Sequence, residues 1–220
     1  MPILIDTPKF LRACFFMRND DTSTIQDSLP VVAPKQIHGS EILCVNDGNF
    51  SEYTLPLRPD ADGVLLLTTR AGASLRFADC APVMVWGESW VMILHSGYKG
   101  TVLNISGHGL ELVRQKLGDD ALKGAGAWIG PCIGREHYCR DEPEEWTQRG
   151  LKSFHRENFD VRDGKVYFDL AGEIRTQLLE GGLSEGNIAL SGRDTFTDSE
   201  CCSYRRGDIT KRMTLYVRML

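Results

Sequence analysis

The sequence has no cluster of basic residues and no long uninterrupted apolar segment. Its 220 residues carry a formal net charge of -5, and the lysines and arginines form no stripe of the kind that a general nucleic-acid binder shows. The apolar stretches are interrupted within about ten residues, which is too short to cross a bilayer. The first residues lack the basic start and the long apolar core of a signal peptide. We therefore expect a cytoplasmic protein that binds neither nucleic acid nor membrane.

Closely spaced cysteine pairs are also absent. None of the seven cysteines belongs to a Cys-x-x-Cys motif, and in a reducing compartment they are expected to be free thiols. Histidine is scarce as well, with five in the whole chain. A disulfide scaffold is therefore disfavoured, and at least one cysteine becomes a candidate metal ligand or nucleophile.

Short apolar runs separated by turn residues indicate an α/β fold, a layered mixed-sheet single domain covering residues 1–220. The continuous apolar run 64–68 is typical of a strand buried on both faces. We predict that strands 75–77, 83–86 and 90–94 belong to the same sheet, and that further strands lie at 10–17, 36–46, 125–131, 166–170, 188–190 and 213–220. Helices are predicted at about 24–28, at 102–117 with a stop at Gly118, at 142–154, and after Asp169 as far as Gly181, whereas 47–59 is interpreted as a loop.

Three metal-ligating side chains stand at ends of predicted strands. His38 breaks the 36–46 strand, Cys80 follows the 75–77 strand, and His95 ends the 90–94 strand before a glycine-flanked loop. Loops at strand ends are where α/β folds place ligands. One cysteine with two histidines suits a zinc site that keeps a fourth position open, and this set also suits copper. Taken singly, each residue fits a structural role at least as well as a functional one, and a cysteine in a strand is most often a small buried apolar side chain.

Positively charged residues near these segments are candidate phosphate ligands, although most lysines and arginines in any chain are solvated surface cations. The candidates are Arg18, Lys99, Arg205, Arg206 and Arg212. The predicted helix after Gly100 also aims its first N–H groups at the loop after His95, which favours an anion there. Asp62 and Asp79 are the nearest acidic residues for moving protons. The other histidines, His108, His137 and His155, are interpreted as surface or structural residues.

Seven short motifs occur in an order that resembles the YfiH-like, or laccase-domain, family, and the resemblance covers most of the chain. They are Gln36-Ile37-His38-Gly39, Ala61-Asp62-Gly63, Ala78-Asp79-Cys80-Ala81-Pro82-Val83, His95-Ser96-Gly97-Tyr98-Lys99-Gly100, Gly130-Pro131-Cys132-Ile133-Gly134, Phe168-Asp169-Leu170, and Ser203-Tyr204-Arg205-Arg206 with Thr210-Lys211-Arg212. The resemblance implies that His38, Cys80 and His95 are metal ligands. It also implies a layered α/β fold related to enzymes with Cys-His hydrolase-like sites.

Several positions depart from the family pattern around the predicted pocket. Tyr98 and Lys99 stand where the family usually has Trp and Arg, and a lysine keeps the charge of an arginine but lacks its planar fork. The segment His137-Tyr138-Cys139 replaces Cys-Tyr-Glu, and Arg193-Asp194-Thr195 replaces Arg-Cys-Thr. The three ligands themselves are intact, so the departures bear on the substrate rather than on the metal.

The resemblance implies a zinc-dependent enzyme that acts on purine nucleosides, with the nucleoside and phosphate as its partners. In phosphorolysis of adenosine, inosine or guanosine, a phosphate held by Arg18, Lys99 and Arg205 or Arg206 attacks C1′ of the ribose. In deamination of adenosine, zinc acidifies the water that attacks the base. We expect a monomer or a small homo-oligomer.

Three alternatives stay open from the sequence. The first is copper-dependent oxidation of phenols by a laccase-like polyphenol oxidase, for which five histidines are few. The second is a metal-free hydrolase with Cys80 as nucleophile and His95 as base. The third is a protein that binds metal and purine without turnover.

Overall fold

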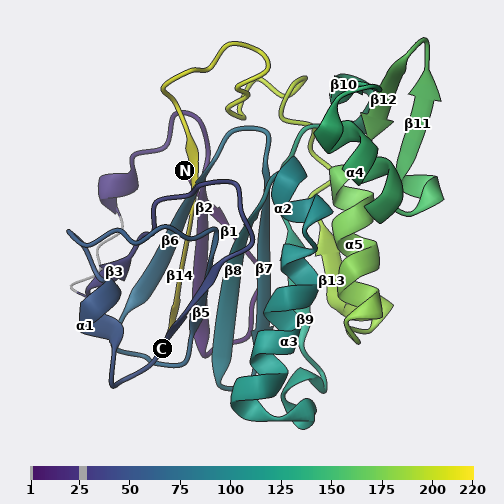
Figure 1. Ribbon diagram of the computed structural model, residues 1–220. Coiled ribbons are helices and arrows are strands. Elements are labelled where there is room, and N and C mark those ends of the chain that lie inside the picture. Colours follow the sequence, from purple (N-terminus) through teal and green to yellow (C-terminus); the bar gives the residue numbers. More distant parts are fainter. Residues whose placement is uncertain (1, 25–28) are drawn as a thin grey trace.

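Two mixed β-sheets packed face to face form the centre of the computed structural model, which describes residues 2–24 and 29–220 (Figure 1). The five-stranded sheet has the spatial order β1 (Ile3–Leu4), β2 (Leu11–Phe16), β14 (Met213–Met219), β6 (Gly72–Phe77) and β3 (Val31–Val32). The six-stranded sheet has the order β13 (Ile188–Leu190), β9 (Gly126–Ile129), β7 (Ala81–Gly87), β8 (Trp90–Ser96), β5 (Gly63–Leu66) and β4 (Ile42–Val45). The last strand, β14, lies between β2 and β6, so the two ends of the chain meet in one sheet.

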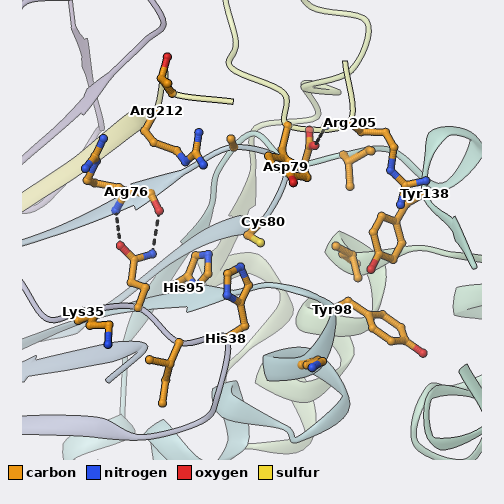
Figure 2. Close-up of a pocket in the computed structure, with 18 of the residues that line it drawn as sticks. Lys35, His38, Arg76, Asp79, Cys80, His95, Tyr98, Tyr138, Arg205 and Arg212 are labelled. Carbon is orange, nitrogen blue, oxygen red and sulfur yellow. Dashed lines mark hydrogen bonds between the residues drawn. The ribbon is translucent and has the colours of Figure 1, made fainter. Parts of the chain in front are cut away.

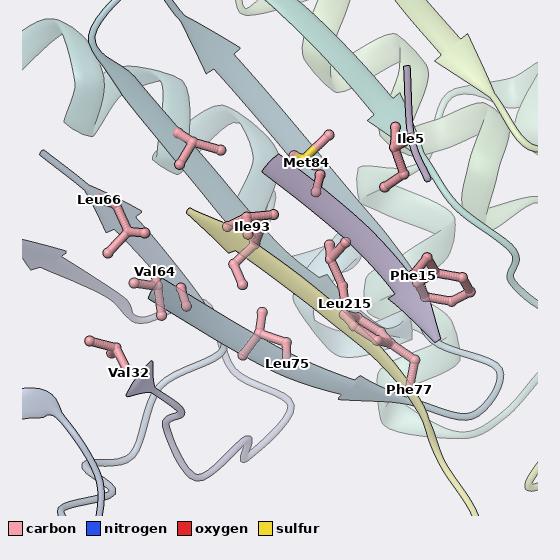
Figure 3. Packing of buried hydrophobic residues seen from close by; sticks show 14 of the residues in the cluster. Ile5, Phe15, Val32, Val64, Leu66, Leu75, Phe77, Met84, Ile93 and Leu215 are labelled. Atoms are coloured by element: carbon pink, nitrogen blue, oxygen red, sulfur yellow. The ribbon is translucent and has the colours of Figure 1, made fainter. Parts of the chain in front are cut away.

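Both faces of the six-stranded sheet are buried, which explains the continuous apolar runs in its strands. In β5, Val64 and Leu66 pack against the five-stranded sheet, whereas Leu65 points to the opposite face. Figure 3 shows Val64 and Leu66 in one cluster with Leu75 and Leu215 of the other sheet. The prediction of a strand buried on both faces is confirmed for this run.

Two helices cover the outer face of the six-stranded sheet, α3 (Ile105–Leu117) and α5 (Leu170–Glu180) (Figure 1). Their ends follow from the sequence. The backbone N–H of Gly118, at a φ of 88°, donates to Arg114 O and ends α3, and Asp169 Oδ1 accepts from Gly172 N at 2.8 Å and begins α5. Both predicted termini are confirmed. No helix in the described part of the chain combines the length and the apolar character needed to span a membrane.

A smaller layer packs beside these helices. It contains the three-stranded sheet β10 (Cys139–Asp141), β12 (Lys165–Phe168) and β11 (Phe159–Arg162), with the helices α4 (Glu145–Ser153) and α2 (Tyr98–Val102). Its core is aromatic, because Tyr98, Phe154 and Phe168 contact one another. The remaining short helix is α1 (Phe50–Tyr53), and the 3-10 turns are Thr22–Thr24, Asp119–Leu122, Arg135–His137, Arg156–Asn158 and Glu185–Asn187. The whole is a mixed α/β single domain, as predicted.

The structure corrects the predicted organisation in several places. Strand β6 belongs to the five-stranded sheet and not to the sheet of β5, β7 and β8. The predicted helix after Gly100 is two helices, because Asn104 adopts a left-handed conformation with a φ of 56° and caps α3 by accepting from Gly107 N. Asn104 thus caps the first turn of α3, and the helix that directly follows the loop after His95 is the short α2 (Tyr98–Val102).

The predicted strand 36–46 is reduced to β4, because His38 and its neighbours bond to a side chain instead of a strand. The predicted loop 47–59 contains α1, and β1, β3, β10 and β11 were not predicted. The helix predicted at about 24–28 falls, apart from Thr24, on residues outside the described part of the chain.

Candidate metal centre and its cavity

The register of the six-stranded sheet brings the predicted ligands to one edge. Strand β8 pairs with β7 and β5 on its two sides, with His95 opposite Pro82 and Leu94 opposite Gly63. Cys80, directly before β7, and Asp62, directly before β5, therefore lie beside the end of β8. Strand β4 runs parallel to β5, so the segment that precedes β4 and carries His38 reaches the same edge.

His38, Cys80 and His95 meet at this edge, as the sequence predicts. Their ligand atoms all lie within 4.8 Å of one another, and the two imidazole rings are 4.9 Å apart at an angle of 73° (Figure 2). Two imidazole nitrogens and one sulfur are a donor set that holds zinc in proteins. The residues present therefore fit a metal ion.

Asp62 orients both the second histidine and the turn that carries the first. Its side chain is fully buried, and Oδ1 accepts from His95 Nδ1 at 2.8 Å. The same carboxylate accepts from the backbone N–H groups of residues 37, 38 and 39 at 3.2, 3.0 and 2.7 Å. Burial alone would raise the pKa of Asp62, but the bonds from His95 and these amides lower it. An ionised carboxylate only accepts, so Asp62 holds a proton on His95 Nδ1, and Nε2 is the ring nitrogen that faces the cluster.

Cys80 and His95 each favour the charged form of the other. Burial would raise the pKa of the Cys80 thiol, but the charge of His95 and hydrogen bonds from the two histidines lower it to about 6. Burial likewise disfavours a charged His95, yet the Cys80 thiolate and the Asp62 carboxylate raise its pKa to about 9. Without a metal the two residues form a thiolate–imidazolium pair, and the thiolate is the form of cysteine that binds metal.

Two glycines and one strained residue allow this close approach. A Cβ on Gly97 would lie 2.6 Å from Cys80 Sγ, and one on Gly100 would lie 3.0 Å from the carbonyl oxygen of Gly39. His38 has a φ of 60°, a left-handed conformation that the Asp62 carboxylate stabilises by accepting three consecutive amides. The glycines of the His95-Ser96-Gly97-Tyr98-Lys99-Gly100 motif thus make room for the ligand sulfur and for the adjoining turn.

Asp79 has a similar structural role on the other side of Cys80. Its Oδ1 accepts from the Thr195 hydroxyl and its Oδ2 from the backbone N–H of Arg205, both at 2.7 Å. Both oxygens of Asp62 and both oxygens of Asp79 therefore accept hydrogen bonds inside the protein. In the structure both residues position their neighbours, and their role in moving protons stays a prediction.

A cavity of about 840 Å³ opens over the three ligands. Among the described residues that line it, seven are lysine or arginine and Asp79 alone is acidic. Three of the predicted phosphate ligands, Lys99, Arg205 and Arg212, belong to this lining. Lys99 Nζ lies 4.8 Å from the centre of the Trp146 ring, and the Arg205 guanidinium lies 5.3 Å from the centre of the Tyr138 ring. Aromatic faces hold these cations without neutralising them.

The other two predicted phosphate ligands, Arg18 and Arg206, do not line the cavity. Arg18 forms an ion pair with Asp208 at 2.6 Å. Arg206 donates to the carbonyl oxygens of Thr195 and Phe196 and also reaches Asp208, so it ties the segment before β14 together. The cavity lining contains four cations that sequence reasoning missed, Lys35, Arg58, Arg76 and Arg140. No motif marks them, because they come from separate loops and strands.

The departures from the family pattern are accommodated locally. His137 Nδ1 lies 2.6 Å from Asp194 Oδ2, so two of the departing residues contact each other, and the His137 ring stacks on Phe196. Tyr98 is buried and donates its hydroxyl to Trp146 O at 2.8 Å. A Cβ on Gly150 would lie 2.1 Å from that hydroxyl oxygen, so Gly150 makes space for the tyrosine.

The model of the family described as multi-copper polyphenol oxidoreductase laccase matches residues 17–219. This chain belongs to that laccase family. Among curated proteins, the laccase-family chain is 28% identical over 190 residues to the purine nucleoside phosphorylase of Aquifex aeolicus, covering 86% of this chain and 83% of that protein. It is also 28% identical over 198 residues to the purine nucleoside phosphorylase of Borreliella burgdorferi, covering 86% and 80%.

Solved structures share the fold of this laccase-family chain. The hypothetical protein YfiH of Bacillus licheniformis superposes with a TM-score of 0.88 at 22% identity, covering 100% of this chain and 96% of that chain. YlmD of Geobacillus stearothermophilus superposes with a TM-score of 0.80 at 20% identity, covering 96% and 92%. The expected fold and family are thereby confirmed.

Proposed function

We propose that the protein is a metal-dependent purine nucleoside phosphorylase, with zinc as the metal. The observation that carries the proposal is the juxtaposition, in one cavity, of the His38, Cys80 and His95 cluster with the unneutralised cations of Lys99 and Arg205. The relatives named as purine nucleoside phosphorylases support the substrate class. When bound, zinc would supply Lewis acidity that polarises a substrate oxygen or acidifies a water.

Lys99 and Arg205 are proposed to bind the attacking phosphate. Both belong to the cavity lining, and neither forms an ion pair with a carboxylate in the described part of the chain. Their charges stabilise the phosphate dianion and hold it in the orientation for attack on C1′ of the ribose. The bond between C1′ and the base nitrogen then breaks, and the products are a free purine base and ribose 1-phosphate.

The other residues of the site are proposed to position these groups. Asp62 fixes the His95 tautomer and the His38 turn, and Asp79 holds the backbone of Arg205 over the cavity. Ile133, Leu170 and Tyr138 give the cavity an apolar wall against which a purine ring can pack. Arg18 and Arg206 are assigned to the stability of the segment before β14 and have no part in phosphate binding.

One observation favours a second candidate function. Cys80, His95 and Asp62 are arranged as a thiolate, an imidazole and an orienting carboxylate, the order of groups in a cysteine hydrolase. In that reading Cys80 attacks a carbonyl group and His95 donates the proton to the leaving group. A metal-free enzyme of this kind keeps its activity after chelation, whereas the proposed phosphorylase loses it.

The proposal is tested with protein loaded with zinc and incubated with adenosine, inosine or guanosine, with and without phosphate. We expect free base and ribose 1-phosphate only when both phosphate and metal are present. We expect Arg205→Ala to raise KM for phosphate about tenfold or more, the loss of one charged hydrogen bond. The matched control is Lys211→Ala, which removes an exposed cation outside the cavity lining.

Two further activities are measured with the same protein preparation. Inosine formed from adenosine in the absence of phosphate measures deamination, the second activity that the family resemblance implies. Oxidation of a phenol by copper-loaded protein measures the activity in the family description. No base, no ribose 1-phosphate and no inosine from protein of full metal occupancy would overturn the proposed function.

A further inference from the structure

The cavity has a second cationic side that the proposed function does not use. Arg58, Arg76 and Arg212 line the same cavity as the three ligands. Figure 2 shows Arg76 and Arg212 on one side of the cluster and Arg205 with Tyr138 on the opposite side. The ligand cluster therefore lies between two groups of positive charge.

Arg58 and Arg212 are held by groups that leave their charge intact. Arg212 Nη1 donates to the carbonyl oxygens of residues 208, 209 and 211 at 3.1, 2.9 and 2.7 Å. Arg58 donates from Nε and Nη2 to the carbonyl oxygens of residues 33 and 34 at 2.9 and 3.1 Å. A neutral carbonyl fixes a guanidinium in place without cancelling its charge. Each arginine has five N–H donors, so both keep donors for a ligand.

Arg76 is fixed through its backbone. The side-chain amide of Gln36 accepts from Arg76 N at 2.9 Å and donates to Arg76 O at 2.7 Å (Figure 2). This pairing ties the backbone at the end of β6, where Arg76 stands, to the segment that carries His38. The Gln36 of the Gln-x-His-Gly motif thus acts as the link between them.

No ion pair neutralises these three arginines within the described ranges 2–24 and 29–220. The contrast is Arg18, close by in the fold, whose charge is balanced by Asp208. Three guanidinium groups without a carboxylate partner give the cavity a positive potential that attracts an anion. In a chain whose net charge is -5, their collection in one cavity points to an anionic ligand.

We propose that Arg58, Arg76 and Arg212 form a second anion subsite, which binds the 5′-phosphate of a nucleoside monophosphate. The inference rests on the proposed function for the nucleoside part of the ligand. In a β-nucleoside the base and C5′ lie on one face of the ribose, and a phosphate that attacks C1′ approaches from the other. The attacking phosphate and the 5′-phosphate therefore need two separate groups of cations. Lys99 and Arg205 form the first group, and Arg58, Arg76 and Arg212 form the second.

The test compares adenosine 5′-monophosphate, adenosine and inorganic phosphate by isothermal titration calorimetry with zinc-loaded full-length protein. We expect the monophosphate to bind at least about tenfold more tightly than adenosine, the gain from one or more charged hydrogen bonds. Arg76→Ala and Arg212→Ala each remove most of this gain and leave the affinities for adenosine and inorganic phosphate within twofold. Arg76→Lys, which keeps the charge, retains part of the gain, and Lys211→Ala retains all of it.

Other results of this titration would contradict the second subsite. If Arg205→Ala alone abolishes the gain, or if wild-type protein binds the monophosphate no more tightly than adenosine, the second subsite is overturned. The second subsite is also overturned if Arg76→Ala weakens the binding of the monophosphate and of adenosine by the same factor. Tight binding of the monophosphate that depends on Arg76, without any cleavage of nucleosides, supports the subsite and refutes the proposed function instead.

Discussion

Replacement of Asp62 by Asn tests whether one buried carboxylate organises the metal centre. The two side chains have nearly the same shape, but asparagine has one acceptor oxygen and one donor NH₂ group. In the structure each oxygen of Asp62 accepts two hydrogen bonds, Oδ1 from His38 N and His95 Nδ1, and Oδ2 from the amides of Ile37 and Gly39. The NH₂ group of asparagine must therefore face two donors, whichever way the amide is turned.

The expected loss in the free energy of unfolding follows from the number of hydrogen bonds that Asp62→Asn removes. With the NH₂ group at the Oδ2 position, the amides of Ile37 and Gly39 lose a charged acceptor, which costs about 1.5–3 kcal/mol for each bond. With the NH₂ group at the Oδ1 position, His95 must become an acceptor at Nδ1, and the proton moves to the Nε2 that faces Cys80. We expect a loss of about 3–5 kcal/mol in the free energy of unfolding, or roughly 6–20 °C in Tm for a chain of this size. We expect a loss of about 10–100-fold in zinc affinity.

Zinc affinity is measured by competition with a chromophoric chelator, and stability by urea unfolding of the metal-free protein. Asp60→Asn is the matched control, because Asp60 is an exposed acid two residues away whose partner, Lys35, is 3.6 Å distant and also exposed. We expect the control to change stability by less than about 0.5 kcal/mol. Wild-type zinc affinity and stability in Asp62→Asn would refute the reasoning, since the carboxylate would then neither set the His95 tautomer nor hold the turn.

Three further substitutions test other parts of the structure. Gly97→Ala, whose Cβ would lie 2.6 Å from Cys80 Sγ, is expected to weaken zinc binding tenfold or more at a cost of about 1–3 kcal/mol, and unchanged binding in the chelator assay would contradict the close approach. Arg206→Ala removes donors to four main-chain carbonyls and is expected to cost about 3 kcal/mol in urea unfolding, so a cost under about 0.5 kcal/mol would show that the bonds contribute little. Burial opposes a charge on His155, but its bonds to the buried Glu173 raise its pKa, so its stabilisation is full below about pH 6.5 and disappears as pH rises through the folded pKa. His155→Gln should therefore destabilise the protein more at pH 6 than at pH 9, and an equal effect at both pH values contradicts this assignment.

The sequence was sufficient for features that depend on local chemistry. The run 64–68 is apolar at every position but the last, and only a strand covered on both faces explains it. Asp169 and Gly118 mark helix ends because one side chain accepts a first-turn amide and the other residue adopts a left-handed backbone. His38, Cys80 and His95 could be recognised as candidates because each is a metal-ligating residue type at a break or an end of a predicted strand.

Features that depend on pairing between distant segments could not be read from the sequence. Strand β6 is a short run with buried apolar residues, as β7 and β8 are, and only its pairing with β14 places it in the other sheet. The same limit applies to charge. Arg18 and Arg205 look equivalent as isolated cations, yet Asp208 neutralises the first, whereas Asp79 holds the backbone of the second over the cavity. Which arginine keeps its charge for a ligand depends on tertiary contacts.

Two of the departures from the family pattern, His137 and Asp194, belong to the support of Arg205. His137 and Asp194 replace family residues at two places in the chain and bond to each other at 2.6 Å, so neither replacement should be judged alone. Asp194 also accepts from Gly134 N and thereby fixes the segment that carries Thr195. The Thr195 hydroxyl donates to Asp79, and Asp79 accepts from the backbone N–H of Arg205. The replaced pair therefore stands at the start of a chain of contacts that ends at a proposed phosphate ligand. Because that chain of contacts is complete in this protein, these two replacements bear on the support of Arg205, whereas Lys99, a third departure, changes a proposed phosphate ligand itself.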